Sequence, residues 1–198
     1  LEQTMKIFGD VISGNCLKVK YTADYLGIPY EWVPIDILKQ QAKTAEFLNL
    51  NPAGQVPVIE LDDGRTLSQS NAIIQYLAAG SQLLPENAFE RAKINELLFW
   101  EQYSHEPYVA VCRFVMRYQG KRAGERELWR VERGEAALNY MENWLMDRDW
   151  FVSGRISIAD IALLAYARLA HEGGFDLSER PRVIAWIDRC VAELSIQD

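Results

Sequence analysis

The chain has 198 residues, 49% of them hydrophobic, with 28 acidic and 21 basic side chains and a net charge of −7. This length and composition suffice for one large domain or two small ones with a substantial core, and they exclude an intrinsically disordered chain. The basic residues are scattered along an acidic chain, which argues against nucleic acid as the main partner. The sequence therefore indicates a globular protein with no nucleic-acid partner.

Cysteine use and hydropathy indicate the cellular compartment. The three cysteines, Cys16, Cys112 and Cys190, are odd in number, far apart and without metal-ligand spacing. Neither a signal peptide nor an apolar run long enough to cross a membrane is recognisable. We therefore expect a cytoplasmic protein with no metal and no membrane partner. We also expect Met5 to be the native first residue, with Leu1–Thr4 added before it.

The first part of the chain alternates between short strands and short helices. Its β-α-β-α-β-β-α order predicts a small mixed sheet with helices on its faces. An Asp-Asp-Gly turn at residues 62–64 indicates a hairpin, and Gly80 ends the last helix of this part. The expected strands cover residues 5–9, 30–35, 58–61 and 65–67, and the expected helices cover residues 16–26, 44–50 and 70–79.

The pattern changes after Gly80. Residues 81–87, which include Pro85, predict a linker. Beyond it the apolar spacing is helical throughout, so the sequence predicts an α+β domain at residues 1–80 followed by an all-α domain at residues 88–198. The expected helices of the second domain cover residues 88–119, 124–147, 157–171 and 180–194.

One helix start in the second part has the pattern of a capping box. Ser157 is expected to cap the helix and Asp160 to reach back from the third helical position, while Ile156 packs against Ile161. The residues that follow, 162–167, are apolar nearly all round, so this helix is expected to be buried. We therefore assign Asp160 a structural role and not a catalytic one.

Residues 56–76 combine two features that suit a small peptide-like ligand. Pro57 precedes a short buried strand, and in the cis form it would turn the backbone N–H and C=O of Val56 outward. Gln69 and Ser70 begin a helix whose unpaired N–H groups favour an anion such as a carboxylate. Taken singly, an X-Pro bond and a serine at a helix start are common structural features. Their succession in the chain predicts a peptide edge beside an anion site.

The turn between the first strand and the first helix, residues 13–16, reads Ser-Gly-Asn-Cys. A thioredoxin-type redox site would have Cys-x-x-Cys at this point, so a hydroxyl replaces the first thiol. A serine nucleophile needs a partner base, yet the two histidines of the chain, His105 and His171, both lie outside the first domain. Ser13 therefore either caps the helix or donates a hydrogen bond to an anion that arrives with the ligand, for which a thiolate is suitable.

Together these motifs resemble those of a cytosolic glutathione transferase of a bacterial type, over essentially the whole chain. The resemblance implies a thioredoxin-like glutathione-binding domain at residues 1–80, an all-helical domain at residues 88–198, a homodimer and a role in detoxification. The matching segments are residues 13–19, 26–30, 47–52, 54–58, 67–73 and the capping box at 157–160.

The resemblance also implies how the peptide edge and the anion site would hold glutathione. Val56 would pair its backbone with the cysteinyl part of glutathione, next to a cis Pro57. Gln69 and Ser70 would hold the γ-glutamyl carboxylate and amine. These four residues, together with Gln55 and Lys43, form the expected binding site for the co-substrate, which requires no metal.

The position of the sulfur follows from the same resemblance. Ser13 would lie where a serine or cysteine of the family meets the glutathione sulfur. Asn15 matches an asparagine that has this role in some bacterial and fungal relatives. Both residues are therefore expected to be catalytic.

Two positions depart from the pattern of the family. Many relatives have Glu or Asp where this chain has Gln69, so that recognition of the glutathione amine loses a charge. Ala42 stands where a histidine often binds the glycyl carboxylate. We expect Lys39, Lys43 or Gln55 to compensate for it.

The second substrate is expected to be a small hydrophobic electrophile, bound between the domains along the first long helix of the second one. Its candidates include Tyr103, and Tyr108 and Arg113 are preferred because they are polar within an apolar stretch. His105 is a candidate general base, whereas Cys112 and Phe114 are expected to belong to the core.

Three functions agree with these features. The first is a transferase that joins the glutathione thiolate to an electrophile. The second is a glutathione-dependent disulfide reductase or peroxidase, which Asn15 and its turn also allow. The third is a glutathione-binding protein of the same fold without catalysis.

Overall fold

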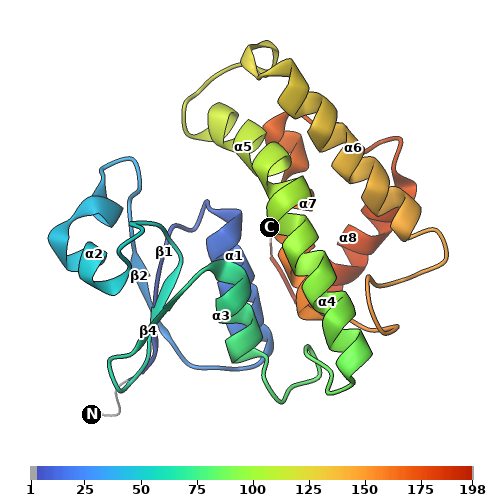
Figure 1. Ribbon diagram of the computed structural model, residues 1–198. Coiled ribbons are helices and arrows are strands. Elements are labelled where there is room, and N and C mark those ends of the chain that lie inside the picture. The colour runs from blue at the N-terminus through green and yellow to red at the C-terminus, as the bar shows by residue number, and fades with distance from the viewer. Residues whose placement is uncertain (1–3, 198) are drawn as a thin grey trace. The chain divides into compact units, whose positions relative to one another are not determined.

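The computed structural model describes residues 4–197, so the expectation for the segment before Met5 lies largely outside the described residues. The chain divides into two compact units, one ending at Ser81 and one beginning at Gln82 (Figure 1). No helix among the described residues is both long and apolar enough to cross a membrane.

The first unit contains a four-stranded mixed sheet in the order β2-β1-β3-β4. β1 pairs in parallel with β2, and β3 pairs antiparallel with both β1 and β4. The parallel pair needs a crossover, which α1 supplies between β1 and β2. The strands are β1 (Lys6–Gly9), β2 (Glu31–Pro34), β3 (Val58–Glu60) and β4 (Thr66–Ser68), and the helices are α1 (Gly14–Tyr25), α2 (Ala45–Leu50) and α3 (Ser70–Leu77).

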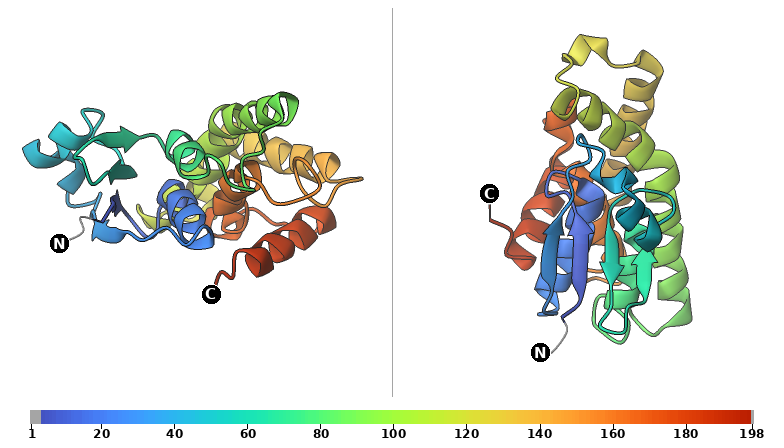
Figure 2. Two further views of the ribbon diagram at one scale, coloured as in Figure 1. Left: turned by 90° about the horizontal axis from the view of Figure 1, so that it is seen from below. Right: turned by 90° about the vertical axis from the view of Figure 1, so that its left-hand side faces the viewer.

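Helices cover both faces of this sheet (Figure 2). α1 and α3 lie side by side on one face, where Ile7, Ile59 and Ile73 are fully buried. Since successive side chains of a strand point to opposite faces, Phe8 points the other way and packs against a cluster that includes Phe47 of α2. This arrangement confirms the thioredoxin-like fold expected for the first domain.

The second unit is helical throughout its described residues. Every residue of α7 is buried, which makes it the central helix, as its all-round apolar sequence predicts. The helices are α4 (Ala88–Trp100), α5 (Glu106–Arg117), α6 (Leu128–Trp144), α7 (Ile158–Ala167) and α8 (Pro181–Glu193).

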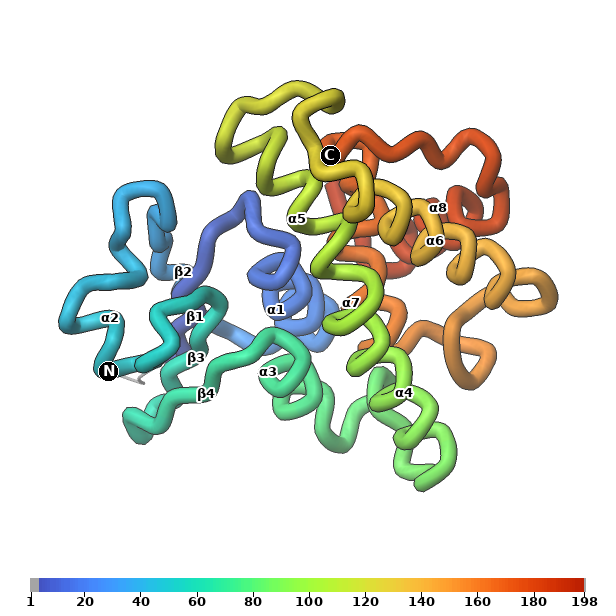
Figure 3. The backbone as a smooth tube through the Cα atoms, turned by 45° about the horizontal axis from the view of Figure 1, so that its top comes forward, coloured from blue at the N-terminus to red at the C-terminus, as the bar shows by residue number. Residues whose placement is uncertain are grey.

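The long helix expected over residues 88–119 is divided in the structure. A π-helical segment, Glu101–His105, separates α4 from α5, although the two follow one another along one column in Figure 3. Pro107 lies in the first turn of α5 and has no N–H, so the regular ladder cannot continue through it. The hydrogen-bonding pattern changes just before this proline.

The other helix boundaries also differ from the expected ones. Residues 123–125 form a separate 3₁₀ turn before α6, and residues 170–173 form another after α7. The expected linker at residues 81–87 contributes to the second unit, because Leu83 is fully buried and its carbonyl accepts the Ile158 N–H at 3.1 Å. An apolar residue in this connection was a signal for a packed segment and not a free linker.

The capping box at the start of α7 is confirmed. Both the backbone N–H and the hydroxyl of Ser157 donate to Asp160 Oδ2 at 2.9 Å. The other oxygen of Asp160 accepts the Phe151 N–H and the Trp186 Nε1–H, each at 3.0 Å. Asp160 is fully buried and all these contacts are internal, so its role is structural.

Candidate functional site

The β1–α1 turn leaves the hydroxyl of Ser13 out of helix capping. Ser13 occupies the N-cap position with extended backbone angles, φ −72° and ψ 120°, but its side chain makes no capping hydrogen bond. Its backbone N–H donates to the Asp10 carbonyl at 3.0 Å, and Asp10 Oδ1 accepts the Ile12 N–H at 2.8 Å. The turn is thus held by Asp10, and the serine hydroxyl is not required to hold it.

Cys16, one turn into α1, is an inert thiol. It is fully buried, and burial raises the pKa of its thiol to about 12, although a backbone hydrogen bond from Asp10 and a side-chain hydrogen bond from Ser13 oppose the rise. A thiol with this pKa is protonated at neutral pH and is neither a nucleophile nor a redox centre. Any reactive sulfur at this turn must therefore come from a ligand.

Gly9, at the end of β1, allows the indole ring of Trp32 and the side chain of Cys16 to pack closely against the backbone. A Cβ at this position would lie 2.7 Å from the indole ring of Trp32 and 3.2 Å from the Cβ of Cys16. Both distances are shorter than ordinary van der Waals contact, so glycine is required here for steric reasons. The close packing keeps the region beneath the Ser13 turn filled.

The start of α3 lies against the start of α1. Ser70 Oγ donates to Asn15 Oδ1 at 3.0 Å, and the fully buried Lys18 donates from Nζ to Asn71 Oδ1 at 3.4 Å. These two hydrogen bonds connect the N-terminal parts of the two helices. They bring together Asn15 and Ser70, which the sequence predicted to act on different parts of one ligand.

Gln69 has a backbone conformation that sequence reasoning did not anticipate. It precedes α3 with φ +72° and ψ 110°, a combination that residues with a side chain rarely adopt. Its side chain is exposed and makes no capping bond, while the backbone N–H of Ser70 has no acceptor among the described residues. Strained backbone of this kind is common where a ligand binds.

The peptide bond between Val56 and Pro57 is cis, as expected. The sheet ladder begins at Val58, so the N–H and C=O of Val56 have no hydrogen-bond partner within residues 4–197. Val56 thus presents one donor and one acceptor of an extended backbone, which is what a second extended peptide needs in order to pair with it.

The loop before Val56 is held in place by two side chains. Asn51 Nδ2 donates to the Gln55 carbonyl at 2.8 Å, and Lys43 Nζ donates to the carbonyls of Gly54 at 2.8 Å and Ala53 at 3.3 Å. The sequence predicted no role for Asn51 beyond the end of the helix expected at residues 44–50. Its residue type was a signal for one, since asparagine often holds a turn through its side chain.

The residues expected to replace the missing histidine are placed as follows. The ammonium of Lys43 is engaged by the loop carbonyls, and the ammonium of Lys39 pairs with Asp36 at 3.2 Å. Ala42 is buried with Phe47 in the core of the unit. The side chain of Gln55 is exposed.

The three helical candidates for the electrophile site have separate partners. Arg113 is almost fully buried and donates from Nε to Glu172 Oε2 at 2.6 Å. The hydroxyl of Tyr108 accepts from Arg133 Nη1 at 3.1 Å. His105 is fully buried in the π-helical segment. These hydrogen-bond partners of Tyr108 and Arg113 differ, and an electrophile site built from all three residues stays a prediction.

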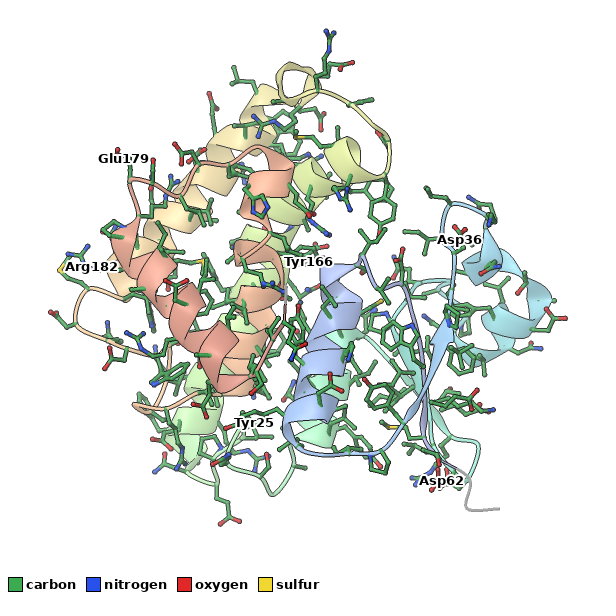
Figure 4. The ribbon with its side chains drawn as sticks, turned by 180° about the vertical axis from the view of Figure 1, so that it is seen from behind. Tyr25, Asp36, Asp62, Tyr166, Glu179 and Arg182 are labelled. Carbon is green, nitrogen blue, oxygen red and sulfur yellow. The ribbon has the colours of Figure 1, made fainter. Side chains whose placement is uncertain are left out.

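A separate opening lies at the other end of the first unit. It has a volume of about 790 Å³ and is lined by residues that include Tyr30, Glu60 and Asp62. In Figure 4, Asp62 lies at the same end of this unit as Tyr25, the last residue of α1. Asp36 lies at the opposite end, which is also the end where α1 starts. This opening therefore contains none of the residues described above.

The described residues contain no group of histidine, cysteine and carboxylate side chains that could hold a metal ion. The chemistry that this arrangement offers is hydrogen bonding. The available groups are the starts of α1 and α3, the amides of Asn15 and Gln69, the hydroxyls of Ser13 and Ser70, and the backbone of Val56. Such groups bind and orient a peptide-like anion and stabilise negative charge on it.

Comparisons with known proteins agree with this arrangement. Residues 12–79 match the family described as "Glutathione S-transferase, N-terminal domain", and residues 105–193 match "Glutathione S-transferase, C-terminal domain". A solved glutathione S-transferase from Pseudomonas fluorescens is 48% identical, with 94% of each chain covered and a TM-score of 0.91.

Curated relatives are more distant. Human glutathione S-transferase theta-2 is 28% identical over 98% of this chain and 83% of its own length. Maleylacetoacetate isomerase from Rhizobium meliloti is 30% identical over 90% of this chain and 87% of its own length. The similarity therefore extends over both units, while the names of the relatives include more than one activity.

Proposed function

Because the chain belongs to the glutathione S-transferase family, we propose that it is a glutathione transferase that joins the thiolate of glutathione to a small hydrophobic electrophile in the reducing cytoplasm. The observation that carries this proposal is the Ser13 turn. Its hydroxyl is not used for capping, and the neighbouring Cys16 is buried with a raised pKa. A site with hydrogen-bond donors but no reactive thiol of its own suits a reaction whose sulfur belongs to the ligand.

The energetics of such a site are favourable. A free thiol has a pKa of roughly 8.5, and lowering it by about two units takes about 2.7 kcal/mol. One hydrogen bond to a charged acceptor supplies roughly 1.5–3 kcal/mol and the start of a helix adds about 0.3–1 kcal/mol. Ser13, with Asn15 beside it, can therefore hold the sulfur as a thiolate at neutral pH.

The reaction then needs no group from the protein to carry a covalent bond. The thiol loses its proton to solvent on binding, and the thiolate attacks the electrophilic carbon. A carbon–sulfur bond forms while the displaced electron pair leaves with the leaving group or moves onto the acceptor. The protein contributes by orienting the tripeptide and by keeping the sulfur charged.

The rest of the site supports the binding of glutathione. The free N–H and C=O of Val56 suit an extended pairing with the cysteinyl residue. The start of α3, with Gln69 and Ser70, suits the γ-glutamyl carboxylate. Here Ser70 acts through its backbone N–H, because its hydroxyl donates to Asn15.

A thiolate titration tests the role of Ser13. Bound glutathione is titrated in the ultraviolet, where the thiolate absorbs, in the wild type and in Ser13→Ala and Asn15→Ala. We expect Ser13→Ala to raise the apparent pKa of the bound thiol toward its free value. An unchanged pKa in Ser13→Ala with a raised one in Asn15→Ala would transfer the role to Asn15.

An activity panel separates this function from the two alternatives. The wild type is assayed with glutathione against an aryl halide, a hydroperoxide and a mixed disulfide. Turnover of the aryl halide supports the transferase, and turnover of only the other two supports a reductase or peroxidase. An isomerase assay is added to the panel, because one relative is named as an isomerase. If glutathione binds and all four assays fail, the protein is a binding protein.

We also propose that the protein is a homodimer, because large aromatic side chains are exposed on α4 and just beyond its end. Phe89 is 73% exposed and Phe99 is 74% exposed, and Tyr103, just beyond the end of α4, is 80% exposed. Their spacing places them along one side of α4 and of the π-helical segment that follows it. A self-complementary helix face is the usual basis of a two-fold dimer.

Sedimentation velocity tests the homodimer. We expect a dimer for the wild type and a monomer for Phe99→Glu, since burying a charge in place of an aromatic side chain is strongly unfavourable. Leu128→Glu is the matched control, because Leu128 is also 71% exposed but lies on α6. A monomeric wild type at micromolar concentration would reject the homodimer.

A further inference from the structure

This inference rests on the proposed function and concerns the ligand class of the same site. We propose that the site recognises the γ-glutamylcysteine part of its thiol ligand and contributes almost no binding energy to the C-terminal residue. The substrate class is therefore γ-glutamylcysteinyl thiols in general, of which glutathione is one member.

The course of the ligand follows from the two ends of the site. If the γ-glutamyl group lies at the start of α3 and the cysteinyl residue pairs with Val56, the third residue continues past Val56 on the side away from α3. An extended residue spans roughly 3.5 Å, so the third residue lies beside the loop at residues 51–55 and the short turn at residues 41–43. Whether the protein binds the carboxylate of this third residue therefore depends on the cationic side chains of this region.

Both cations in this region are already engaged. Residues 36–57 contain two, Lys39 and Lys43. The Lys43 ammonium donates to the carbonyls of Gly54 and Ala53 at 2.8 and 3.3 Å, and a Cβ at Gly54 would lie only 2.7 Å from it. Lys43 therefore holds the loop that presents Val56, and two of its three N–H donors are engaged by backbone carbonyls.

The second lysine offers little to a ligand. The side chain of Lys39 is 77% exposed and pairs with Asp36 at 3.2 Å. An exposed pair of this kind contributes little binding energy, because water screens it. Beside it Ala42 is buried in the core and Gln55 carries no charge, so the C-terminal carboxylate of the ligand meets no dedicated cation from this region.

The γ-glutamyl end is constructed differently. There Ser70 is almost fully buried and hydrogen-bonded to Asn15, and the Ser70 N–H has no acceptor among the described residues. The ammonium of Lys18 is fully buried next to them, bonded to Asn71. Buried, mutually oriented donors discriminate strongly between a ligand that satisfies them and one that does not.

Titration calorimetry with the wild-type protein tests the inference. Four thiols are compared: glutathione, its glycyl ethyl ester, γ-glutamylcysteine and cysteinylglycine. An exposed ion pair is worth at most about a fivefold change in Kd, so we expect the ester and γ-glutamylcysteine to bind within about fivefold of glutathione. Cysteinylglycine lacks the γ-glutamyl group, and we expect it to bind at least about tenfold more weakly.

The outcomes distinguish this inference from the function on which it rests. If glutathione binds and both the ester and γ-glutamylcysteine bind with a Kd more than about fivefold higher, the protein recognises the glycyl carboxylate. The inference is then wrong. If glutathione itself does not bind, the proposed function is wrong. The comparison between ligands needs no variant, so it does not depend on the folding of one.

A variant of Lys43 separates holding the loop from binding the carboxylate. Because Lys43 holds the loop, Lys43→Gln should weaken glutathione and γ-glutamylcysteine by the same factor. A loss confined to glutathione would show that Lys43 binds the glycyl carboxylate and would overturn the inference. Lys121→Gln removes the same charge from an exposed position of the helical unit and serves as the control.

Discussion

The helices α1 and α7 each begin after a serine, Ser13 and Ser157, but the hydrogen-bonding groups at the two helix starts differ in what they contact. At α7, Asp160 is fully buried and its two oxygens accept from Ser157, Phe151 and Trp186 at 2.9–3.0 Å. At α1, the serine side chain makes no capping bond and is partly exposed.

The difference teaches how one local pattern serves two purposes. A helix start inside a core must satisfy all its polar groups internally, because an unsatisfied buried group is destabilising. A helix start at a ligand site has the opposite requirement, since groups that are already satisfied cannot bind a ligand. The four predictions below test this contrast, from the largest expected effect to the smallest.

The largest effect is expected for Asp160→Ala. Removing the carboxylate leaves several buried donors without an acceptor, and we expect the free energy of unfolding in urea to fall by about 3 kcal/mol or more. Asp176→Ala is the control, because Asp176 is a carboxylate that accepts from Ser178 at 2.8 Å in an exposed turn. A loss for Asp160→Ala no larger than that of the control would remove the structural half of the contrast.

The second prediction exchanges the two serines for alanine. Ser157→Ala should lower the free energy of unfolding by about 1–2 kcal/mol and leave the activity per folded molecule unchanged, while Ser13→Ala should cost less than about 0.5 kcal/mol. In contrast, Ser13→Ala should lower kcat/KM by about tenfold or more, since it removes a hydrogen bond to a charged sulfur. Equal effects of the two variants on stability and on kcat/KM would contradict the contrast.

The third prediction concerns Cys16, one turn after Ser13. We expect Cys16→Ala to cost about 1 kcal/mol of stability and to leave kcat/KM within about twofold, because a buried thiol takes no part in the reaction. Mass spectrometry should find Cys16 unalkylated by iodoacetamide in the native protein and alkylated in urea. Rapid native alkylation at pH 7 would place a reactive sulfur in the protein.

The pH dependence that Cys16 adds has a definite sign. Its pKa is raised by burial from the ordinary 9.0 to about 12, so the folded state binds its proton more tightly than the unfolded state. The resulting stabilisation is fully present below pH 9 and is lost as the pH rises toward about 12. Between pH 6 and about 8, Cys16 should therefore add no slope to the free energy of unfolding.

The smallest effect is expected for Gln69→Gly. Glycine adopts φ +72° without strain but loses more entropy on folding, so the free energy of unfolding should rise by no more than about 1 kcal/mol. Glutathione binding should weaken, because the side chain next to the γ-glutamyl group is lost. A variant that is clearly less stable would mean that the Gln69 side chain holds the start of α3.

Much of the fold was predictable because its signals are local. Apolar spacing predicted each strand and most of each helix, and the Ser157–Asp160 pattern predicted a capping box that the structure contains. The cis bond before Pro57 and the free backbone of Val56 also agree with the sequence interpretation. In each case the residues that determine the feature lie within a few positions of it.

Other features could not be predicted from neighbouring residues. The π-helical segment Glu101–His105 interrupts a continuous apolar pattern, and that pattern does not indicate the change from α-helical to π-helical hydrogen bonding. Tyr108 and Arg113 lie five positions apart on one helix, yet Arg113 pairs with Glu172, which is distant in sequence. The apolar stretch around these polar residues predicted an electrophile site and held no signal for the partners Glu172 and Arg133, while their role in that site stays a prediction.

The sequence by itself determined the two-unit architecture, the family and the positions of the two helix starts, because hydrophobic period and capping residues act over short distances. Only the tertiary structure decided which polar groups remain available to a ligand. Lys43 is a candidate carboxylate ligand in the sequence and a support for a loop in the fold, while Ser13 is a possible cap in the sequence and makes no capping hydrogen bond in the fold. The physical reason is that a hydrogen-bonding group is satisfied or left available by its neighbours in space, and the sequence alone does not specify those neighbours.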